Sequence, residues 1–391
     1  MKSRSESGMN TVSPAKWSAL TDSNFPFSEH DYLSALEETN CVGKESGWIP
    51  CHLTVWEKDM LYGALFLYEK NNGYGEYIFD WGWAQAYERN GLNYYPKLVS
   101  AVPFTPATGR KLLVHPEVDD DQVRKKLLEE ALDCMRRRNC SSLHFLYITT
   151  EEISTFNSMG FLIRHSFQFH WKNNNYQNFD QFLSTLKRKR RKEIIRERKQ
   201  IKEQMITVTI LEGDDITREH IAQMYKFYIS TINRKWGHPY LSLEFFYRIH
   251  HTMLKRLVLI LAYINKDCVA GSINFQKGDC LYGRYWGCKG TYRSLHFEIC
   301  YYQPIEFAIR KGISLFEAGA QGEHKIQRGF LPELTYSAHW LEHKGFRTSI
   351  SNFLEAEKES IRQGIKEFSP HSPYRDSPSL AAFESFFACD I

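Results

Sequence analysis

The chain has 391 residues, which is enough for two or three domains of ordinary size with sizeable cores. Its formal net charge is only +4, so any binding of an anionic partner must come from local clusters of basic residues. Nine cysteines without CxxC spacing, and the lack of a secretion signal or of any apolar run near the ~20 residues that cross a bilayer, predict a cytoplasmic protein with reduced thiols and no zinc site.

The first half of the chain predicts strands followed by a helix. Apolar runs at 53–56 and 63–68 flank a polar turn, which is typical of a hairpin. An aromatic segment at 77–82 is predicted to be the next strand. Residues 119–135 begin with carboxylates and carry apolar residues on one face, which predicts a helix.

The second half repeats this order. Residues 257–264 and 269–275 predict a hairpin, 282–287 an aromatic strand, and about Leu295 to Arg310 a helix. Strand, helix, strand order predicts a mixed sheet with covering helices. A short strand follows each helix, at 142–145 and 314–316.

A near-repeat ends each half. Residues 159–171 and 328–340 align without a gap and share Gly, Phe, Leu, His and Trp in one register. We therefore predict one α/β unit used twice, with ligand bound in the cleft between the two units. The His-Trp pairs of the repeat are interpreted as structural.

The predicted fold class is α/β, with two tandem units that each contain a mixed, mainly antiparallel sheet flanked by helices. The predicted parts are a flexible N-terminus (1–24), a first unit (25–177), a basic helical connector (178–205), a second unit (206–350) and a C-terminal helix and tail (351–391).

Several strings of the sequence resemble a known family. They are Phe79-Asp-Trp-Gly-Trp-Ala84, Tyr94-Tyr-Pro-Lys-Leu98, residues 102–109, residues 186–192, Gly283-Arg-Tyr-Trp-Gly-Cys288, Leu295-His-Phe-Glu298 and residues 316–325. The element order resembles the GNAT acyltransferase unit, and two such units joined by a basic helix resemble the Fem aminoacyltransferases that build peptidoglycan cross-bridges. The strings identify the chain as a member of the FemAB-like group of predicted N-acyltransferases, mostly bacterial. This resemblance implies transfer of an acyl or aminoacyl group to an amine, without implying a substrate.

Six adjacent basic residues at 187–192 fall on a predicted helix. Like charges repel, so the run is unfavourable for folding and suits a phosphate-rich partner. That partner is tRNA, a sugar-nucleotide pyrophosphate or an anionic lipid surface; the alternative is a solvated linker helix, partly neutralised by Glu193 and Glu197. The anion-binding candidates here are Lys187, Arg188, Lys189, Arg190 and Arg191.

A second candidate site lies at the start of the second helix. Ser294 is predicted to be its N-cap, which places His296 and Glu298 in the first turn as catalytic candidates. The alternative for Glu298 is simple stabilisation of the helix dipole, which is worth ~0.3–1 kcal/mol.

The same junction is the predicted donor site. In GNAT enzymes, according to the resemblance, the donor's pyrophosphate docks at this strand-to-helix junction, so Lys289 and Arg293 are anion-binding candidates. The usual Gly-rich acyl-CoA loop is missing from both halves. Residues 115–121 take its place in the first half and are acidic, so we expect the donor to bind the second half.

The polar loop after the second short strand is the main catalytic candidate. Amine attack on an ester or thioester needs a proton acceptor, for which Glu323 or His324 is suitable. It also needs a donor to the oxyanion, for which Lys325 or Arg328 is suitable. The alternative is a polar loop with a surface ion pair.

An aromatic cluster in the first half is the predicted acceptor pocket, with Asp80 holding a cationic amine and rings framing it. The alternative is that these rings belong to the core. The substrate-binding candidates are Asp80, Trp81, Tyr87, Tyr94 and Tyr95 in the first half and Arg284, Trp286, Gln321 and Arg328 in the second.

The predicted function is therefore an N-acyltransferase that works by direct attack, without metal, permanently bound cofactor or covalent enzyme intermediate. The donor is aminoacyl-tRNA or acyl-CoA, with an acyl carrier protein as a variant of the latter. The acceptor is an amine on a phosphate-bearing or lipid-linked molecule, which allows peripheral contact with an anionic membrane. A different class, a non-catalytic module that binds RNA or anionic lipid, stays open. The sequence does not predict the oligomeric state.

Overall fold

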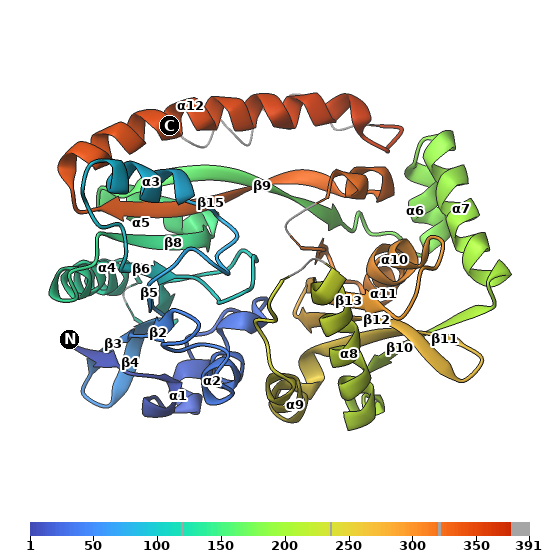
Figure 1. Ribbon diagram of the computed structural model, residues 1–391, viewed down its shortest axis with the longest axis horizontal. Helices are drawn as coiled ribbons and strands as arrows, with labels where there is room; N and C mark the ends of the chain where they lie inside the picture. The colour runs from blue at the N-terminus through green and yellow to red at the C-terminus, as the bar shows by residue number, and fades with distance from the viewer. Residues whose placement is uncertain (119, 235–236, 320–321, 377–391) are drawn as a thin grey trace. The chain divides into compact units, whose positions relative to one another are not determined.

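The computed structural model describes residues 1–118, 120–234, 237–319 and 322–376, and its helices and strands are labelled in Figure 1. The chain divides into two compact units. Unit 1 consists of Met1–Ser166, Tyr240–Phe245 and Thr335–Ser360, and unit 2 of Phe167–Pro239, Phe246–Leu334 and the chain from Ile361.

Unit 1 contains a small antiparallel sheet with the order β1-β3-β4-β7. Its strands are β1 (Lys2–Glu6), β3 (His52–Glu57), β4 (Met60–Leu65) and β7 (Leu113–Val114). The first predicted hairpin is confirmed, since β3 and β4 pair with Leu53 opposite Leu65. Short helices α1 (Pro14–Ser18) and α2 (His30–Glu38) precede it, and α1 contacts β4.

A second sheet of unit 1 has the order β2-β5-β6-β8, followed by the final part of β15. Its strands are β2 (Trp48–Pro50), β5 (Tyr68–Lys70), β6 (Lys97–Ser100), β8 (Ser142–Ile148) and β15 (Leu331–Leu341). Strands β6 and β8 run parallel. Every residue of both strands is buried, as expected for parallel strands.

Helix α4 (Asp120–Arg137) makes the crossover between these parallel strands. It confirms the predicted helix at 119–135 apart from residue 119, which lies outside the described residues, and it buries one apolar face. Helix α5 (Thr150–Ser158) follows β8.

The predicted strand at 77–82 is wrong. Trp81 instead begins helix α3 (Trp81–Arg89), and Asp80 takes its N-cap position. Trp83 and Tyr87 are the buried residues of this helix, and their four-residue spacing is that of a helix face. The aromatic residues of this segment therefore belong to a helix that packs on the core, and not to a β-strand.

Unit 2 contains a sheet with the order β10-β11-β12-β13-β14-β9. Its strands are β10 (Ile206–Glu212), β11 (Leu257–Ile264), β12 (Asp267–Lys277), β13 (Cys280–Cys288), β14 (Leu315–Glu317) and the end of β9 (Leu162–Lys172). The second predicted hairpin, β11 and β12, and the aromatic strand, β13, are confirmed. As in unit 1, the sheet contains one parallel pair, β13 with β14.

A continuous helical segment makes the crossover in unit 2 and confirms the second predicted helix. It consists of α10 (Leu295–Phe297), a π-helical turn η5 (Glu298–Tyr302) and α11 (Gln303–Lys311). Pro304 lacks the N–H that would continue the α-helical pattern, which accounts for a wider turn just before it. Ser294 occupies the N-cap position, but it does not cap with its side chain; its hydroxyl lies 2.9 Å from Gln200 Oε1.

The two near-repeats form the long strands β9 and β15. Each of these strands pairs with a strand from the other half of the sequence. Strand β9 follows the first α/β block, yet it pairs with β14 in unit 2, with Trp171 opposite Phe316. Strand β15 follows the second block, yet it pairs with β8 in unit 1, with Trp340 opposite Leu143. Each unit is thus completed by the strand of the other block.

The remaining helices are α6 (Phe179–Thr185), α7 (Arg188–Glu203), α8 (Arg218–Arg234), α9 (Leu243–Thr252) and α12 (Lys344–Phe368). Helix α8 packs directly on β13 (Figure 1), and a Cβ at Gly287 would lie 2.0 Å from the Phe227 carbonyl oxygen. All eight cysteines of the described residues are free thiols. Within the same residues, every helix is too short or too polar to span a bilayer.

Candidate active site

The candidate site is a small cavity of about 70 Å³ in unit 2. It lies beside the part of β13 that has no β14 partner, since β13 pairs with β14 only from Cys280 to Tyr282 and continues to Cys288 paired with β12. A volume of about two waters at ~30 Å³ each admits the reacting end of a substrate and not a whole donor. The lining residues are Ser272, Asn274, Gly283, Arg284, Tyr285, Trp286, His296, Cys300, Tyr301 and Ala318.

Aromatic rings bring two predicted residues, His296 and His324, to this cavity. The His296 ring lies 4.3 Å from that of Trp286 and 5.9 Å from that of His324, measured between centroids. Tyr301 lies on the helical segment, and its hydroxyl is 2.9 Å from His324 Nε2. The cavity therefore has a phenol on its wall that is hydrogen-bonded to an imidazole.

His324 is solvent-exposed, and the rings of Phe297 and Tyr301 cover it only in part. This partial desolvation, followed by Arg328 and Lys325, lowers the pKa of His324 below its usual value of 6.5, which favours the neutral imidazole. Burial also raises the pKa of Tyr301 far above 10, so this phenol stays protonated. In the tautomer whose Nε2 accepts the phenol proton, this pair forms a two-member proton relay, with Tyr301 lining the cavity.

Lys325 is buried and is not itself a lining residue of the cavity, although the lining residues Cys300 and Arg284 influence its charge. It belongs to the 3₁₀ helix η6 (Glu323–Arg328), and its ammonium donates to the Gly319 carbonyl oxygen at 2.6 Å. Burial is the main cause that lowers its pKa from 10.5 to about 8, and the lining residues Cys300 and Arg284 add smaller effects. A lysine with such a pKa, next to two lining residues, is a candidate donor to a developing oxyanion.

Glu298 is the first residue of the π-helical turn η5 and is not among the lining residues of the cavity. Its Oε1 accepts hydrogen bonds from Arg198 at 3.1 Å and from Gln303 at 2.7 Å. Its Oε2 is buried, without a hydrogen-bond partner among the described residues. This carboxylate is held in an ion pair, which is a structural role, and its predicted catalytic role remains a prediction.

Arg328 is committed to contacts within the unit. Its Nη2 donates to Glu197 at 2.8 Å, and its guanidinium lies 3.3 Å from the centroid of the Phe297 ring. Tyr302 also donates to Glu197. Glu323 is exposed and absent from the cavity wall, and Gln321 lies outside the described residues.

The predicted anion-binding residues at the helix start do not line the cavity. The Lys289 ammonium pairs with Asp267 at the surface. Arg293 is exposed, and its backbone N–H donates to Gln204 Oε1 at 3.0 Å. The predicted anion-binding residues of the basic run, Lys187 to Arg191, lie at the start of α7, where Arg190 pairs with Glu193 at 2.9 Å.

In unit 1, Asp80 has partners within the chain. It accepts from Lys97 and, at 2.5 Å, from the Tyr94 hydroxyl, and Lys97 also donates to Glu76 at 2.8 Å. Lys97 is fully buried, and its carboxylate partners raise its pKa despite burial. The Asp80 carboxylate thus already holds a cationic amine, that of Lys97.

Three of the predicted aromatic residues line a separate hollow of about 600 Å³ in unit 1. They are Trp81, Tyr94 and Tyr95. Trp81 is 50% exposed, so its ring is available to a ligand. Tyr87 does not line the hollow; it is buried and stacks on Phe346, and burial raises its pKa to about 12. Asn72, Gln85 and Glu88 add polar groups to the wall.

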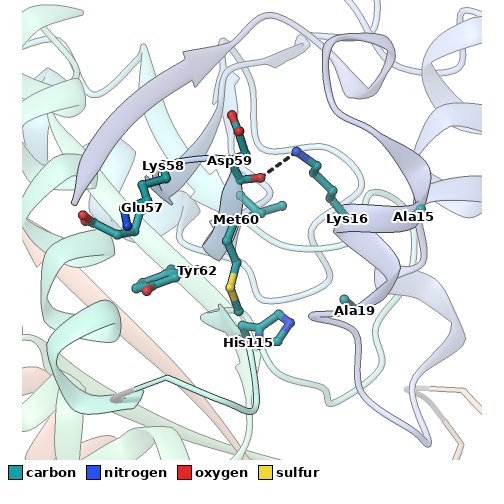
Figure 2. A pocket seen from close by; sticks show the side chains of 10 residues that line it. Ala15, Lys16, Ala19, Glu57, Lys58, Asp59, Met60, Tyr62 and His115 are labelled. Atoms are coloured by element: carbon teal, nitrogen blue, oxygen red, sulfur yellow. Dashed lines mark hydrogen bonds between the residues drawn. The ribbon is translucent and has the colours of Figure 1, made fainter.

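A larger hollow of about 860 Å³ in unit 1 contains none of the predicted residues. Figure 2 shows Lys16 pointing toward Asp59, whose carbonyl oxygen accepts its hydrogen bond at 2.6 Å. The hollow lies beside the turn of the β3–β4 hairpin, and most of its charged side chains are solvent-exposed. Its lining includes no buried titratable group with a shifted pKa, so we do not assign chemistry to it.

Sequence reasoning missed Tyr301, Cys300 and the polar lining residues Ser272 and Asn274. Tyr301 lies four residues after Phe297 on a helix, a spacing that is equally typical of a buried face. Its bond to His324 joins two elements that no local pattern connects. A search for metal ligands finds no group of three or more His, Cys, Asp or Glu side chains within the described ranges.

Comparisons with known proteins agree with this fold. A family model described as FemAB-like, peptidoglycan biosynthesis and recognition, matches residues 8–376. The structure of FemX shares 11% identity over 90% of this chain and 100% of its own, with a TM-score of 0.53. L-PGS from Bacillus licheniformis shares 10% over 90% and 97%, with a TM-score of 0.52.

A tandem GNAT protein from the clavulanic acid biosynthesis pathway shares 9% identity over 87% of this chain and 98% of its own, with a TM-score of 0.42. No curated protein matches the sequence. At these identities the solved structures bear on the fold alone. The predicted α/β class with mixed sheets and flanking helices is confirmed, and the fold is similar to that of FemX.

Proposed function

The chain belongs to the FemAB-like family, and from that premise we propose that it transfers an acyl or aminoacyl group to an amine at the unit 2 cavity. The observation that carries the proposal is the hydrogen bond between Tyr301, on the cavity wall, and a neutral His324. Lys325, buried beside lining residues with a pKa of about 8, supports it.

The relay supplies the proton movements that amine attack requires. As the amine nitrogen bonds to the carbonyl carbon, its proton passes to Tyr301 Oη while the Tyr301 proton passes to His324 Nε2. The carbonyl oxygen becomes an oxyanion, which the Lys325 ammonium stabilises. When the intermediate collapses, the carbon–oxygen or carbon–sulfur bond of the donor breaks, and the His324 proton returns through Tyr301 to the leaving group.

The hollow of unit 1 is the proposed acceptor site. Exposed Trp81 and the rings of Tyr94 and Tyr95 suit a cationic amine or the face of a sugar. Asp80 acts behind these rings as a positioning residue, since it holds Tyr94 and Lys97. This assignment replaces direct capture of the amine by Asp80, because Lys97 occupies that carboxylate.

The donor is aminoacyl-tRNA or an acyl thioester, both of which carry an activated acyl carbon and phosphates. Unit 2 is the proposed donor side, since the first turn of its crossover helix carries one carboxylate, Glu298, which is paired with Arg198, whereas α4 begins with Asp120 and Asp121. The missing Gly-rich loop favours tRNA over coenzyme A. Ribonuclease treatment separates the two, because only the tRNA-dependent reaction is abolished by it.

The test follows labelled acyl groups from a pool of aminoacyl-tRNAs, and separately from acyl-CoA, into amine acceptors of a bacterial extract. Transfer by the wild type, lost in Tyr301→Phe, supports the proposal. Transfer that Tyr301→Phe leaves intact contradicts the assigned site. Salt-sensitive binding without transfer from either pool indicates the non-catalytic module.

A further inference from the structure

Helix α7 has one face packed on unit 2 and the opposite face in solvent. Its buried residues are Ile194, Glu197 and Ile201. At ~100° per residue, the opposite side of the helix carries a continuous row of mostly basic residues over about 20 Å. The row consists of Arg188, Lys192, Ile195, Arg196, Lys199 and Lys202.

Most cations of this outer face are exposed and have no ion-pair partner among the described residues. Lys199 is an exception, since it pairs with Glu203 at 3.4 Å. Arg198 turns inward to Glu298 and Glu306, and Arg190 pairs with Glu193 on the flank. The exposed cations without an ion pair are Lys187, Arg188, Lys189, Lys192, Arg196 and Lys202. Their mutual repulsion opposes folding, so the face is complementary to an external anion.

Two large apolar side chains are exposed on this helix and just after its end. Ile195 lies in the middle of the basic row and is 52% exposed, and Met205, just after the helix, is 73% exposed. A phosphate backbone gains nothing from an exposed isoleucine. The interfacial zone of an anionic bilayer accommodates both, because lipid phosphates pair with the cations while acyl chains receive the apolar side chains.

We propose that the outer face of α7 docks on an anionic lipid bilayer. The helix lies in the plane of the interface, with Ile195 inserted and Arg188, Lys192 and Arg196 on the headgroups. A single inserted isoleucine gives little anchoring alone, so the binding is reversible and depends on both salt and anionic lipid. The inference deepens the proposed function, since it would bring the enzyme to lipid-linked acceptors, yet docking needs no transfer chemistry.

The test measures sedimentation of the full chain with phosphatidylcholine vesicles that do or do not contain phosphatidylglycerol, in the absence of donor and acceptor. We expect binding only to the anionic vesicles, with affinity that falls steeply as salt rises. Replacing Arg188, Lys192 and Arg196 together by Gln should weaken it at least tenfold. Ile195→Gln should weaken it several-fold and leave the affinity for a double-stranded RNA oligomer unchanged.

Matched controls come from unit 1. Arg89→Gln with Lys344→Gln removes exposed charges elsewhere, and Phe353→Ser removes an apolar side chain that is 49% exposed. Both control variants should bind vesicles as the wild type does. Equal losses in the controls, or vesicle binding unchanged in the α7 variants, would overturn the proposal, as would a loss of affinity for the RNA oligomer in Ile195→Gln as large as its loss of vesicle binding. Because Tyr301→Phe should bind vesicles normally, failure of docking and failure of the transfer proposal are distinguishable.

Discussion

The parallel strand pairs of the two units have the same topology and different surroundings. In unit 1, the segment 101–107 that follows β6 is buried throughout, and the pair is flanked by the ionic network of Lys97. In unit 2, β13 continues past the end of β14 and leaves a cavity. The same α/β block therefore forms a filled core in one case and an open site in the other.

The two crossover helices also differ in the acidic residues of their first turns. Asp120 and Asp121 stand in the first turn of α4, whereas the first turn of the crossover helix in unit 2 carries one carboxylate, Glu298, which pairs with Arg198. In unit 1 the pKa of Lys97 is raised by the carboxylates that it pairs with, and burial lowers the pKa of Lys70 to about 7, with its ammonium donating to Asn72 and to the Tyr74 carbonyl oxygen. In unit 2 the pKa values of His324 and Lys325 are lowered mainly by desolvation. Paired charges stabilise a fold, whereas a buried lysine with a lowered pKa is available for chemistry.

The largest expected effect is on stability in unit 1. Lys97→Met leaves the carboxylates of Glu76 and Asp80 buried without their cation, which should lower the free energy of unfolding by about 3–5 kcal/mol. Urea denaturation measures it. The matched control, Lys289→Met, removes a surface pair with Asp267 and should cost no more than about 1 kcal/mol. Equal losses would refute the contrast between the units.

The next effect is on turnover in unit 2. Tyr301→Phe removes the relay hydroxyl and should lower kcat about 100-fold, the lower range for general acid–base catalysis, with stability nearly unchanged. The neighbouring Tyr302→Phe breaks a buried bond to Glu197 and should lower stability, leaving kcat of the folded enzyme close to wild type. Steady-state kinetics and denaturation of both variants check this. A reversed pattern would assign the catalytic phenol to Tyr302.

The pH dependence tests Lys325. Its folded pKa of about 8 lies below the usual 10.5, so turnover should decline as pH rises through about 8 and the ammonium is lost. Stability should change in the opposite direction: between about 8 and 10.5 the unfolded chain binds more protons, so raising the pH favours the folded state. Lys325→Arg should move the decline in turnover to higher pH. A decline that is the same in this variant would rule out Lys325 as its cause.

The smallest effect concerns the size of the cavity. Ala318→Val adds two methyl groups to the wall, which should raise KM for the donor about tenfold, equivalent to ~1.4 kcal/mol, while the acceptor KM is unchanged. Ala107→Val at the buried segment of unit 1 is the comparison, since overpacking there should lower stability and leave both KM values unchanged. A change in acceptor KM alone for Ala318→Val would mean that the cavity binds the acceptor.

Much of the fold was predictable from periodicity and turn chemistry. Both hairpins, the crossover helices and the aromatic strand β13 were predicted correctly because each is a local pattern. The strand predicted at 77–82 failed because Asp80 and the four-residue spacing of Trp83 and Tyr87 favour a helix. The strand exchange was not predictable, since pairing of β9 with β14 and of β15 with β8 joins segments far apart in the sequence that no local pattern connects.

The site was predictable only in part. A polar loop after a short strand pointed to His324 and Lys325, and the helix start pointed to His296, which lines the cavity; their catalytic roles remain predictions. Tyr301 was missed because its significance comes from a contact across 23 residues of chain. Glu298 and Arg328 were candidates because a carboxylate and a guanidinium suit proton transfer and oxyanion binding. In the structure they form ion pairs with Arg198 and Glu197 respectively, which could not be predicted because both partners lie far away in the sequence.

The central claim, that unit 2 performs the transfer and unit 1 holds the acceptor, is tested most directly by single-turnover transfer of a labelled acyl group in two variants. The account predicts that Tyr301→Phe slows the chemical step about 100-fold at saturating acceptor, and that Trp81→Ala leaves this step unchanged while raising the acceptor concentration needed for half-saturation. A slow chemical step in Trp81→Ala together with a normal step in Tyr301→Phe would place the reaction in unit 1 and contradict the account.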